Sequence, residues 1–422
     1  LFPIDLPESD DYQTVGGLIL HQYQSFPKIY EIISFDKFEF KILKVTATKI
    51  ELVKLKVKGE INSYDITVFR DKMPLLNELD LSEATVIASS KPFYKTYCTG
   101  NNSLGGYAFY DLDKLISVTL PKGLKIFGDY AFYDCEKLTT VDASHTDEIS
   151  IGAGAFERCS KLENFVSPQK INNINGDAFH SCKKLENIEL RKISGSIGEN
   201  AFFGANIKNV DIDSIGGNIE KYAFKECANL QNVRVGTMTG NLGNNAFGYC
   251  ASLKNVEFGK GPARIGSEVF EVSDSLVSFV AGEGVSEVAD NAFRACVYVK
   301  DIWGALQKVI IPRPELKKVV LPNGVQRIGK EAFYQCTSLS DFAIPQNAVN
   351  IGELAFYGCR SLQSVNIPEG TTSIKSYAFN GCSSLKNITF PSGLTSVGDR
   401  AFYDCAFENL KLPPVLKTIG EY

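Results

Sequence analysis

An apolar-Phe pair, most often Ala-Phe, returns at nearly constant spacing through most of this chain. Eleven of the twelve intervals between these phenylalanines are 22 to 24 residues, and the twelfth, from Phe293 to Phe333, is 40. The full set is Phe109, Phe132, Phe156, Phe179, Phe202, Phe224, Phe247, Phe270, Phe293, Phe333, Phe356, Phe379 and Phe402. A fixed period in this range is typical of a solenoid, in which each repeat forms one coil and successive coils stack.

The composition fits a stacked body with a continuous core. Of the 422 residues 44% are hydrophobic and 22% are charged, and the formal net charge is -5. No long run of Lys or Arg occurs, which argues against nucleic-acid binding. No run of 18 apolar residues occurs, so we predict no membrane span. The chain starts with Leu1, which we interpret as an export signal already removed.

One repeat predicts one strand, one turn and a return segment. Leu362, Val365 and Ile367 alternate with period two, as in a strand with one buried face. Pro368 follows and ends the strand, because proline has no amide hydrogen for the sheet. The glycine that precedes many Ala-Phe pairs predicts a turn with unusual backbone angles. Neighbouring coils then pair in parallel, about 4.8 Å apart.

The repeat frame extends over most of the chain. We count about sixteen strands from Leu52 to Leu412 and expect them to form one curved parallel sheet with short return segments. Residues 51–422 are therefore predicted to be the solenoid, with interruptions near 88–104 and 299–322. Residues 1–50 are predicted to be an N-terminal cap or a small β domain, since an open sheet end invites pairing with other chains.

The pattern V-x-L-P followed by I-G-x-x-A-F-x-x-C-x-x-L resembles the BspA-like, or Treponema pallidum-type, leucine-rich repeat. The likeness is strong over residues 115–412 and looser over 52–114, and the stretch from Leu55 to Ser82 resembles the first repeats of such proteins in Bacteroides-type bacteria. The resemblance implies a bacterial protein that is exported and either secreted or held at the cell surface. It also implies a role in adhesion. The repeat is a scaffold, so no functional residue is carried over.

Ten of the eleven cysteines occupy one slot, three residues after the repeated phenylalanine. They are Cys135, Cys159, Cys182, Cys227, Cys250, Cys296, Cys336, Cys359, Cys382 and Cys405. Coils about 4.8 Å apart hold these side chains farther apart than the Cβ atoms of a disulfide. We therefore predict buried free thiols rather than a disulfide ladder or a metal site. Cys98 lies outside the slot.

No spacing of chemically active side chains predicts catalysis. His21, His145 and His180 have no partner at a spacing that suggests a metal ligand or a nucleophile-base pair. Segment 258–261 has glycines but lacks the rest of a phosphate-binding loop. We predict no catalytic residue, no metal site and no cofactor.

Outward-facing positions on the strands form two columns along the sheet. One contains Asn187, Asn209, Asn232, Asn255 and Asp301, and the other contains Glu189, Asp211, Arg234, Glu257 and Trp303. The asparagines have two interpretations, a hydrogen-bonded ladder along the stack and a ligand-binding face. We favour the ladder because it recurs in coil after coil.

Trp303, the sole tryptophan, is a candidate interface anchor, and packing under the neighbouring segment is the alternative. That segment, 299–322, contains three strand-like templates at offsets too short for a coil, so we expect a hairpin or an extra strand there. The loop 88–104, with Phe93, Tyr94 and Tyr97, is the second interruption. Breaks in a repeat array often carry function.

The sequence thus predicts a non-enzymatic surface or secreted protein. We expect it to bind a protein partner, a host matrix or bacterial surface protein, through the sheet face and one or both interruptions. The alternative is a glycan-binding module, in which Trp303 and the tyrosines stack on sugar rings.

Overall fold

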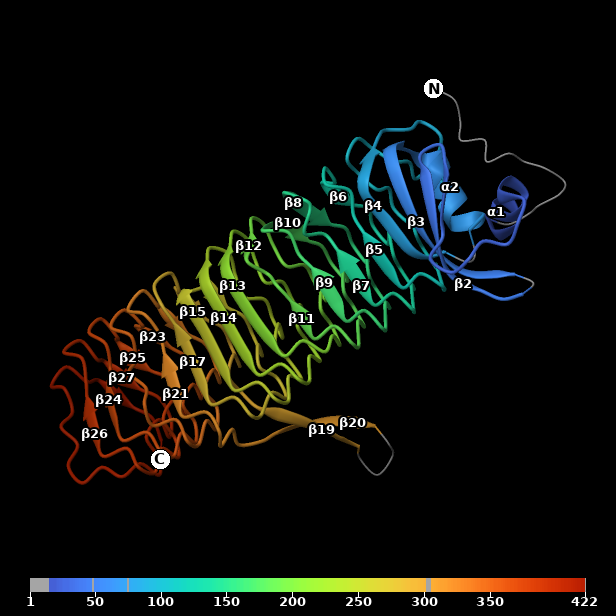
Figure 1. Cartoon of the computed structure of the whole chain (residues 1–422). Helices are drawn as coiled ribbons and strands as arrows, with labels where there is room; N and C mark the ends of the chain where they lie inside the picture. The colour runs from blue at the N-terminus through green and yellow to red at the C-terminus, as the bar shows by residue number, and fades with distance from the viewer. Residues whose placement is uncertain (1–14, 48, 74–75, 301–304, 422) are drawn as a thin grey trace. The chain divides into compact units, whose positions relative to one another are not determined.

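The computed structural model describes residues 15–47, 49–73, 76–300 and 305–421. The chain divides into two compact units. Unit 1 comprises Leu1–Ser194 and Ala201–Ile207, and unit 2 comprises Gly195–Asn200 and Lys208–Tyr422. Both units are stacks of the same coil, with strands of successive coils side by side (Figure 1).

Unit 1 begins with a segment that differs from the repeat. Strand β2 pairs antiparallel with both β1 and β3, whereas β3 and β4 pair in parallel. Asn62 caps helix α2, since its side chain accepts the amide hydrogen of Tyr64 and its own amide donates to Asp65. The parallel stack therefore starts at β3. The elements are α1 (Val15–Tyr23), β1 (Ile32–Phe35), β2 (Phe38–Val45), β3 (Ile50–Ile61), α2 (Ser63–Asp71) and β4 (Leu76–Val86).

The remaining coils of unit 1 carry two columns of parallel strands. The first column follows the L-x-x-V template and contains β5 (Ser117–Thr119), β7 (Thr140–Asp142), β9 (Asn164–Val166) and β11 (Asn187–Ile188). The second contains β6 (Ile126–Phe127), β8 (Glu148–Ile151), β10 (Lys170–Ile174) and β12 (Lys192–Ile193). Part of the predicted return segment is therefore itself a paired strand.

Unit 2 repeats this arrangement. Its first column contains β13 (Asn209–Ile215), β14 (Asn232–Met238), β15 (Asn255–Lys260), β17 (Ser278–Ala281), β21 (Lys318–Val320), β24 (Ser364–Asn366) and β26 (Asn387–Thr389). Its second contains β16 (Arg264–Ile265), β18 (Glu287–Val288), β22 (Arg327–Ile328), β23 (Asn350–Ile351), β25 (Ser373–Ile374), β27 (Ser396–Val397) and β28 (Thr418–Ile419). An antiparallel hairpin, β19 (Cys296–Lys300) and β20 (Leu306–Ile310), stands outside both columns. The prediction of a parallel-stranded repeat solenoid is confirmed.

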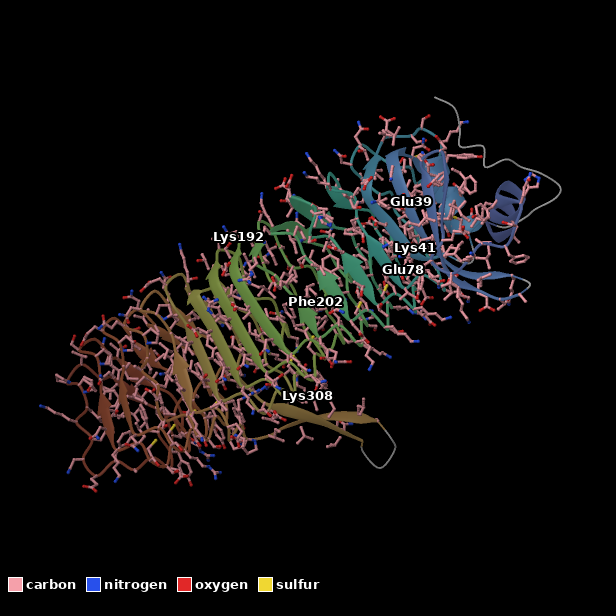
Figure 2. The ribbon with its side chains drawn as sticks, viewed as in Figure 1. Glu39, Lys41, Glu78, Lys192, Phe202 and Lys308 are labelled. Carbon is pink, nitrogen blue, oxygen red and sulfur yellow. The ribbon has the colours of Figure 1, made fainter. Side chains whose placement is uncertain are left out.

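The repeated phenylalanines form a stack inside each unit. Phe132 and Phe156 lie 5.3 Å apart between ring centroids and 9° from parallel, and Phe356 and Phe379 lie 5.2 Å apart. Figure 2 labels Phe202 within this body of side chains. All of these rings except that of Phe402 are fully buried, which is worth about 1.5–3 kcal/mol per side chain. The rings thus set the spacing at which one coil meets the next.

The glycine before Ala-Phe corrects one sequence prediction. It does not adopt a left-handed backbone conformation. Instead, a Cβ atom at Gly128 would lie 2.3 Å from the backbone of Gly105, and one at Gly352 would lie 2.5 Å from Gly329. The positive φ angles fall two residues later, for example at Tyr130 (56°). The glycine is therefore required for the close approach of two coils.

The cysteine slot has a hydrogen-bonding role. Most of its thiols donate to the carbonyl of the phenylalanine in the preceding coil, with Cys135 Sγ 3.1 Å from the oxygen of Phe109. Ser273 fills the same slot, and its hydroxyl donates to Phe247 at 2.6 Å. All eleven cysteines are free thiols, which confirms the prediction for the ten in the slot; nine of these ten are buried and Cys405 is partly buried. The slot favours a small side chain that carries a donor.

Burial of the thiols predicts a loss of stability at alkaline pH. Burial raises the pKa of Cys135 to about 12, and that of Cys336 likewise to about 12. Above pH 9 the thiols of the unfolded chain lose their protons while the buried thiols keep theirs, so the unfolded state is favoured. Each fully buried thiol lowers the free energy of unfolding by up to about 1.4 kcal/mol per pH unit there. Urea unfolding between pH 8 and pH 10.5 measures the effect.

A triple variant provides the control for this pH dependence. The variant combines Cys135→Ser, Cys159→Ser and Cys182→Ser. Each serine keeps a hydrogen-bond donor in its slot, as Ser273 does in the natural chain. We expect the variant to lose less stability than the natural chain as the pH rises, because serine does not ionise in this range. Equal pH slopes for the two proteins would contradict the assignment.

Candidate functional site

The outward face of β13, β14 and β15 carries a ladder of amides. The side chain of Asn232 donates to Asn209 at 3.0 Å, and Asn255 donates to Asn232 at 3.0 Å. Ser278 continues the series with a bond of 2.9 Å to Asn255. Most of these side chains are exposed, yet each amide is hydrogen-bonded to the side chain in the neighbouring coil. The ladder interpretation is confirmed over these four positions.

The neighbouring column on the same strands is charged. Arg234 pairs with Asp211 at 2.6 Å across adjacent coils, and Glu257 lies opposite Arg234 in register. The hydrogen bond and the charge of Asp211 raise the pKa of Arg234. All three side chains are exposed, so the pair contributes little to stability. The six predicted residues on β13–β15 therefore form one polar surface.

The other predicted binding residues fall elsewhere. Asn187 begins β11 in unit 1, where its backbone pairs with Asn164. Glu189 follows β11 and pairs loosely with Arg191, 3.7 Å away. Neither belongs to the surface on β13–β15. Trp303 and Asp301 lie outside the described residues.

The position that the sequence analysis gave to Asp301 belongs to Lys318. Ser278 pairs with Lys318, which in turn bridges to Asp341. The prediction was wrong because the chain from Cys296 leaves the stack as a hairpin, and the next strand to pair with β17 is β21. The 40-residue interval is thus one coil with an insertion, and Phe293 still stacks on Phe333 at 4.9 Å.

The hairpin β19–β20 exposes apolar side chains. Its five described large apolar residues have exposed fractions from 38% to 64%. They are Tyr298, Val299, Leu306, Val309 and Ile310. Figure 1 shows the two strands leaving the stacked coils of unit 2. The hairpin is the extra element that the three crowded strand templates predicted, and it presents an apolar surface to solvent.

Glu271 anchors the root of the hairpin. Its carboxylate accepts hydrogen bonds from Tyr298 at 2.9 Å and from Lys308 at 2.8 Å, one residue from each strand. Asn245 donates to the other carboxylate oxygen at 2.6 Å. Burial opposes ionisation, but these donors outweigh it and lower the pKa of Glu271. Lys308 is labelled on the hairpin in Figure 2. The charged root thus holds both strands of the hairpin to the coil of Glu271.

Arg313 closes the gap that the hairpin leaves in the stack. Cys296 opens β19, and its thiol lies near Glu271 instead of a phenylalanine carbonyl. The guanidinium of Arg313, which is fully buried, donates to the carbonyls of Phe270, Ser273 and Phe293 at 2.7–2.8 Å. Sequence reasoning missed this residue. The flanking Pro312 and Pro314 were the available sign of a fixed backbone there.

The loop 88–104 builds an aromatic cluster in unit 1. Tyr94 and Tyr97 lie 5.2 and 5.3 Å from Tyr107 between ring centroids. Tyr107 stacks on Tyr130 of the next coil at 5.0 Å. Arg70 lies over the ring of Tyr94 at 5.6 Å. The rings are half-buried, so the cluster combines apolar faces with polar hydroxyl groups at the surface.

The described surfaces carry polar, apolar and aromatic side chains. Across the described ranges, no three His, Cys, Asp or Glu side chains are arranged to hold a metal ion. No helix in the part of the chain that the structure describes has the length and hydrophobicity to cross a bilayer. The prominent features are therefore an amide ladder, an apolar hairpin and groups of aromatic rings.

Comparison with known protein families agrees with the coil geometry. The model of the BspA type leucine rich repeat region matches residues 96–195, 174–300 and 313–422, which is more than half of the chain. The chain belongs to the BspA-type leucine-rich repeat family. A second model, the transporter associated domain, matches residues 1–59 of this BspA-type protein. No curated protein sequence matches it.

Several solved bacterial structures are similar to this BspA-type protein. A leucine rich cell surface protein of Faecalibacterium prausnitzii is 21% identical, with 94% of this chain and 96% of the other covered and a TM-score of 0.35. A leucine-rich repeat protein of Bacteroides ovatus is 18% identical, with coverage of 92% and 90% and a TM-score of 0.43. One from Eubacterium ventriosum is 15% identical, with coverage of 92% and 91% and a TM-score of 0.34.

The amide ladder predicts a stability effect at a surface position. Asn232→Ala removes two side-chain hydrogen bonds and should lower the free energy of unfolding by about 1 kcal/mol. Asn387→Ala is the matched control, because Asn387 holds the same slot on β26 without a side-chain hydrogen bond among the described residues. We expect urea unfolding to separate the two variants. Equal midpoints would mean that the ladder does not stabilise the stack.

The buried arginine predicts a larger effect. Arg313→Met removes three buried hydrogen bonds from a charged donor and should lower the free energy of unfolding by about 3 kcal/mol. Arg327→Met is the control, since Arg327 makes only half-exposed ion pairs with Glu287 and Asp290. If Arg313→Met leaves the urea midpoint where it is in the unmodified chain, this role of the arginine is contradicted.

Proposed function

We propose that this protein is a non-enzymatic binding protein that recognises a protein partner through the hairpin β19–β20. The observation that carries the proposal is the set of five exposed apolar side chains on an element that leaves the coil stack. An exposed apolar group of this kind is typical of an interaction site. Glu271 also holds one residue of each hairpin strand, Tyr298 and Lys308, so the described strands are anchored before a partner arrives.

We include the polar face of β13–β15 in the proposed surface. Arg234, Asp211 and Glu257 are exposed there and offer charges that would select a complementary partner. Trp303 and Asp301 belong to the proposal as residues between the two hairpin strands. Asn187 and Glu189 on unit 1 are retained as secondary candidates. The ladder asparagines contribute by holding the face flat rather than by offering free amides.

We further propose that the protein is exported and acts at the cell surface or in the surrounding medium, where a host matrix or bacterial surface protein is the partner. Membership of the BspA-type family supports this location. We also propose that residues 1–50 cap the N-terminal edge of the solenoid. The antiparallel pairing of β2 with β3 supports that role, because it covers the strand at which parallel stacking starts.

Glycan binding is the second candidate function. The tyrosine cluster around Tyr107 favours it, because half-buried rings with hydroxyl groups can contact both the apolar faces and the hydroxyl groups of sugars.

A double substitution on the hairpin tests the protein-partner proposal. Leu306→Asp with Val309→Asp places two charges on the apolar surface, where both residues are exposed and neither supports the core. We expect at least tenfold weaker binding to the partner found in a panel of purified matrix proteins and bacterial surface proteins. Surface plasmon resonance against the same panel measures the change.

Val166→Asp is the matched control for this test. Val166 is an exposed apolar residue on β9, with an exposed fraction of 44%, and lies in unit 1. This variant should bind like the unmodified protein. The proposal fails if no protein of the panel binds, or if the double variant binds as tightly as the control.

A further inference from the structure

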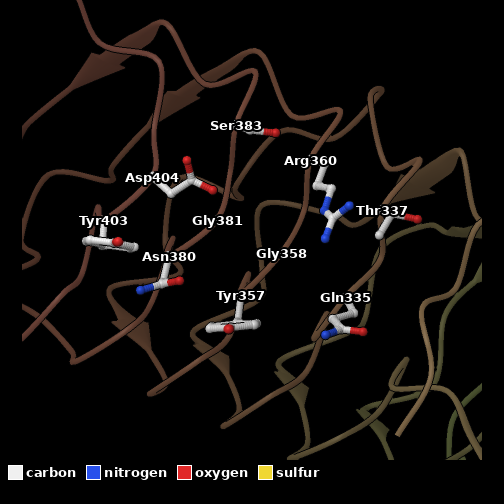
Figure 3. Close-up of a pocket in the computed structure, with 10 residues that line it drawn as sticks. All are labelled: Gln335, Thr337, Tyr357, Gly358, Arg360, Asn380, Gly381, Ser383, Tyr403 and Asp404. Atoms are coloured by element: carbon white, nitrogen blue, oxygen red, sulfur yellow. The ribbon is translucent and has the colours of Figure 1, made fainter.

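The coils near Phe356 and Phe379 enclose a hollow of about 480 Å³ on their turn side. Figure 3 shows three rows of residues around it, contributed by successive coils. One row is Tyr357, Asn380 and Tyr403. The middle row is Gln335, Gly358, Gly381 and Asp404, and the third is Thr337, Arg360 and Ser383. The hollow is thus a trough that runs along several coils of unit 2.

Two successive glycines form the floor of the trough. The middle row holds the residue two positions after the repeated phenylalanine, which has a positive φ in most coils and usually carries a side chain. Gln335 has a φ of 53° and Asp404 has a φ of 58°, so this slot accepts residues other than glycine. Gly358 and Gly381 leave it empty in two adjacent coils. The trough exists because these two side chains are missing, and Gln335 and Asp404 close its ends.

The aromatic row leaves ring faces uncovered. Tyr334 and Tyr357 stack at 4.8 Å and are 5° from parallel. The next coil offers Asn380 instead of a ring, and within the described ranges no ring stacks on Tyr403, which is 52% exposed. Two coil steps separate Tyr357 from Tyr403, about 10 Å at the usual strand spacing. A flat apolar ring over Asn380 would restore the interrupted stack.

The polar groups of the trough are available and carry opposite charges. In the described part of the chain, the side chains of Arg360 and Asp404 make no hydrogen bond or ion pair. Figure 3 shows both beside the glycine floor. Asn380 is 7% exposed and uses one amide donor on the carbonyl of Arg400 at 3.3 Å. Arg360 can only donate hydrogen bonds, Asp404 can only accept them, and the amide of Asn380 can do both. A ligand whose groups both donate and accept, such as hydroxyl groups, would fit this set.

We propose that this trough binds a neutral saccharide of one or two pyranose rings. The carbon face of a sugar ring lies against the free tyrosine faces, above Asn380, while its hydroxyl groups donate to Asp404 and accept from Arg360. The balanced charge of the trough disfavours a strongly charged ligand. A volume of about 480 Å³ is within the range of small-ligand sites. The site shares no residue with the hairpin β19–β20, so it is independent of the proposed protein-binding surface.

Filling the trough tests the proposal. The unmodified chain is titrated with a panel of neutral mono- and disaccharides of glucose, galactose, mannose and N-acetylglucosamine, with binding followed by calorimetry and by NMR. We expect at least one of them to bind, and Gly381→Gln to weaken that binding at least tenfold. Glutamine fits the backbone here, as Gln335 shows, and a Cβ at Gly381 meets only ordinary contacts at 3.5 Å. Tyr403→Ala should weaken binding about tenfold.

Gly204→Gln is the matched control. Gly204 holds the same slot after Phe202, has a φ of 66° and has open space where a Cβ would lie. It should bind the saccharide like the unmodified chain, and thermal unfolding should show all three variants folded. The proposal is overturned if no saccharide of the panel binds to the unmodified chain, or if Gly381→Gln binds as tightly as Gly204→Gln.

Discussion

The carbonyl group of the repeated phenylalanine joins one coil to the next, and the rest of the structure depends on this contact. In most coils this carbonyl accepts the amide hydrogen of the residue three positions later, and its second lone pair accepts a donor from the next coil. Such a hydrogen bond contributes about 0.5–1.5 kcal/mol to stability, and the contribution recurs in most repeats. Cys135 and most other slot cysteines supply a thiol, and Ser273 supplies a hydroxyl. This bond, together with the stacked rings, fixes how one coil sits on the next. Regular stacking in turn aligns outward side chains into columns such as Asn209, Asn232 and Asn255.

The same requirement explains how the stack tolerates an insertion. When the chain departs at Cys296 to form a hairpin, the donor expected from that slot is lost. Arg313 follows the hairpin in the chain, and its guanidinium donates hydrogen bonds to three carbonyls. Because the core is restored, Phe333 stacks on Phe293 as if no residues had been added.

The sequence predicted the strand template, the thiol slot and the hairpin, because each is a local pattern or a departure from one. It misassigned the glycine before Ala-Phe, since close approach of Gly128 to Gly105 is a property of two coils and not of one. It also put Asp301 in a column that belongs to Lys318. Segment 299–322 contains three similar strand templates. Only the pairing of β17 with β21 shows which template continues the column of strands.

The sequence by itself determined the period, the buried ring and the residue type that each slot requires. These follow because every repeat satisfies its backbone hydrogen bonds and buries its apolar side chains in the same way. Tertiary structure decided which chemically ordinary residues gather in one place. Gly358 and Gly381 carry no signal within a single repeat, and they open a trough only when their coils lie side by side between Gln335 and Asp404. Such a site is made of residues that lie about 23 positions apart in the chain, so no pattern within a single repeat predicts it.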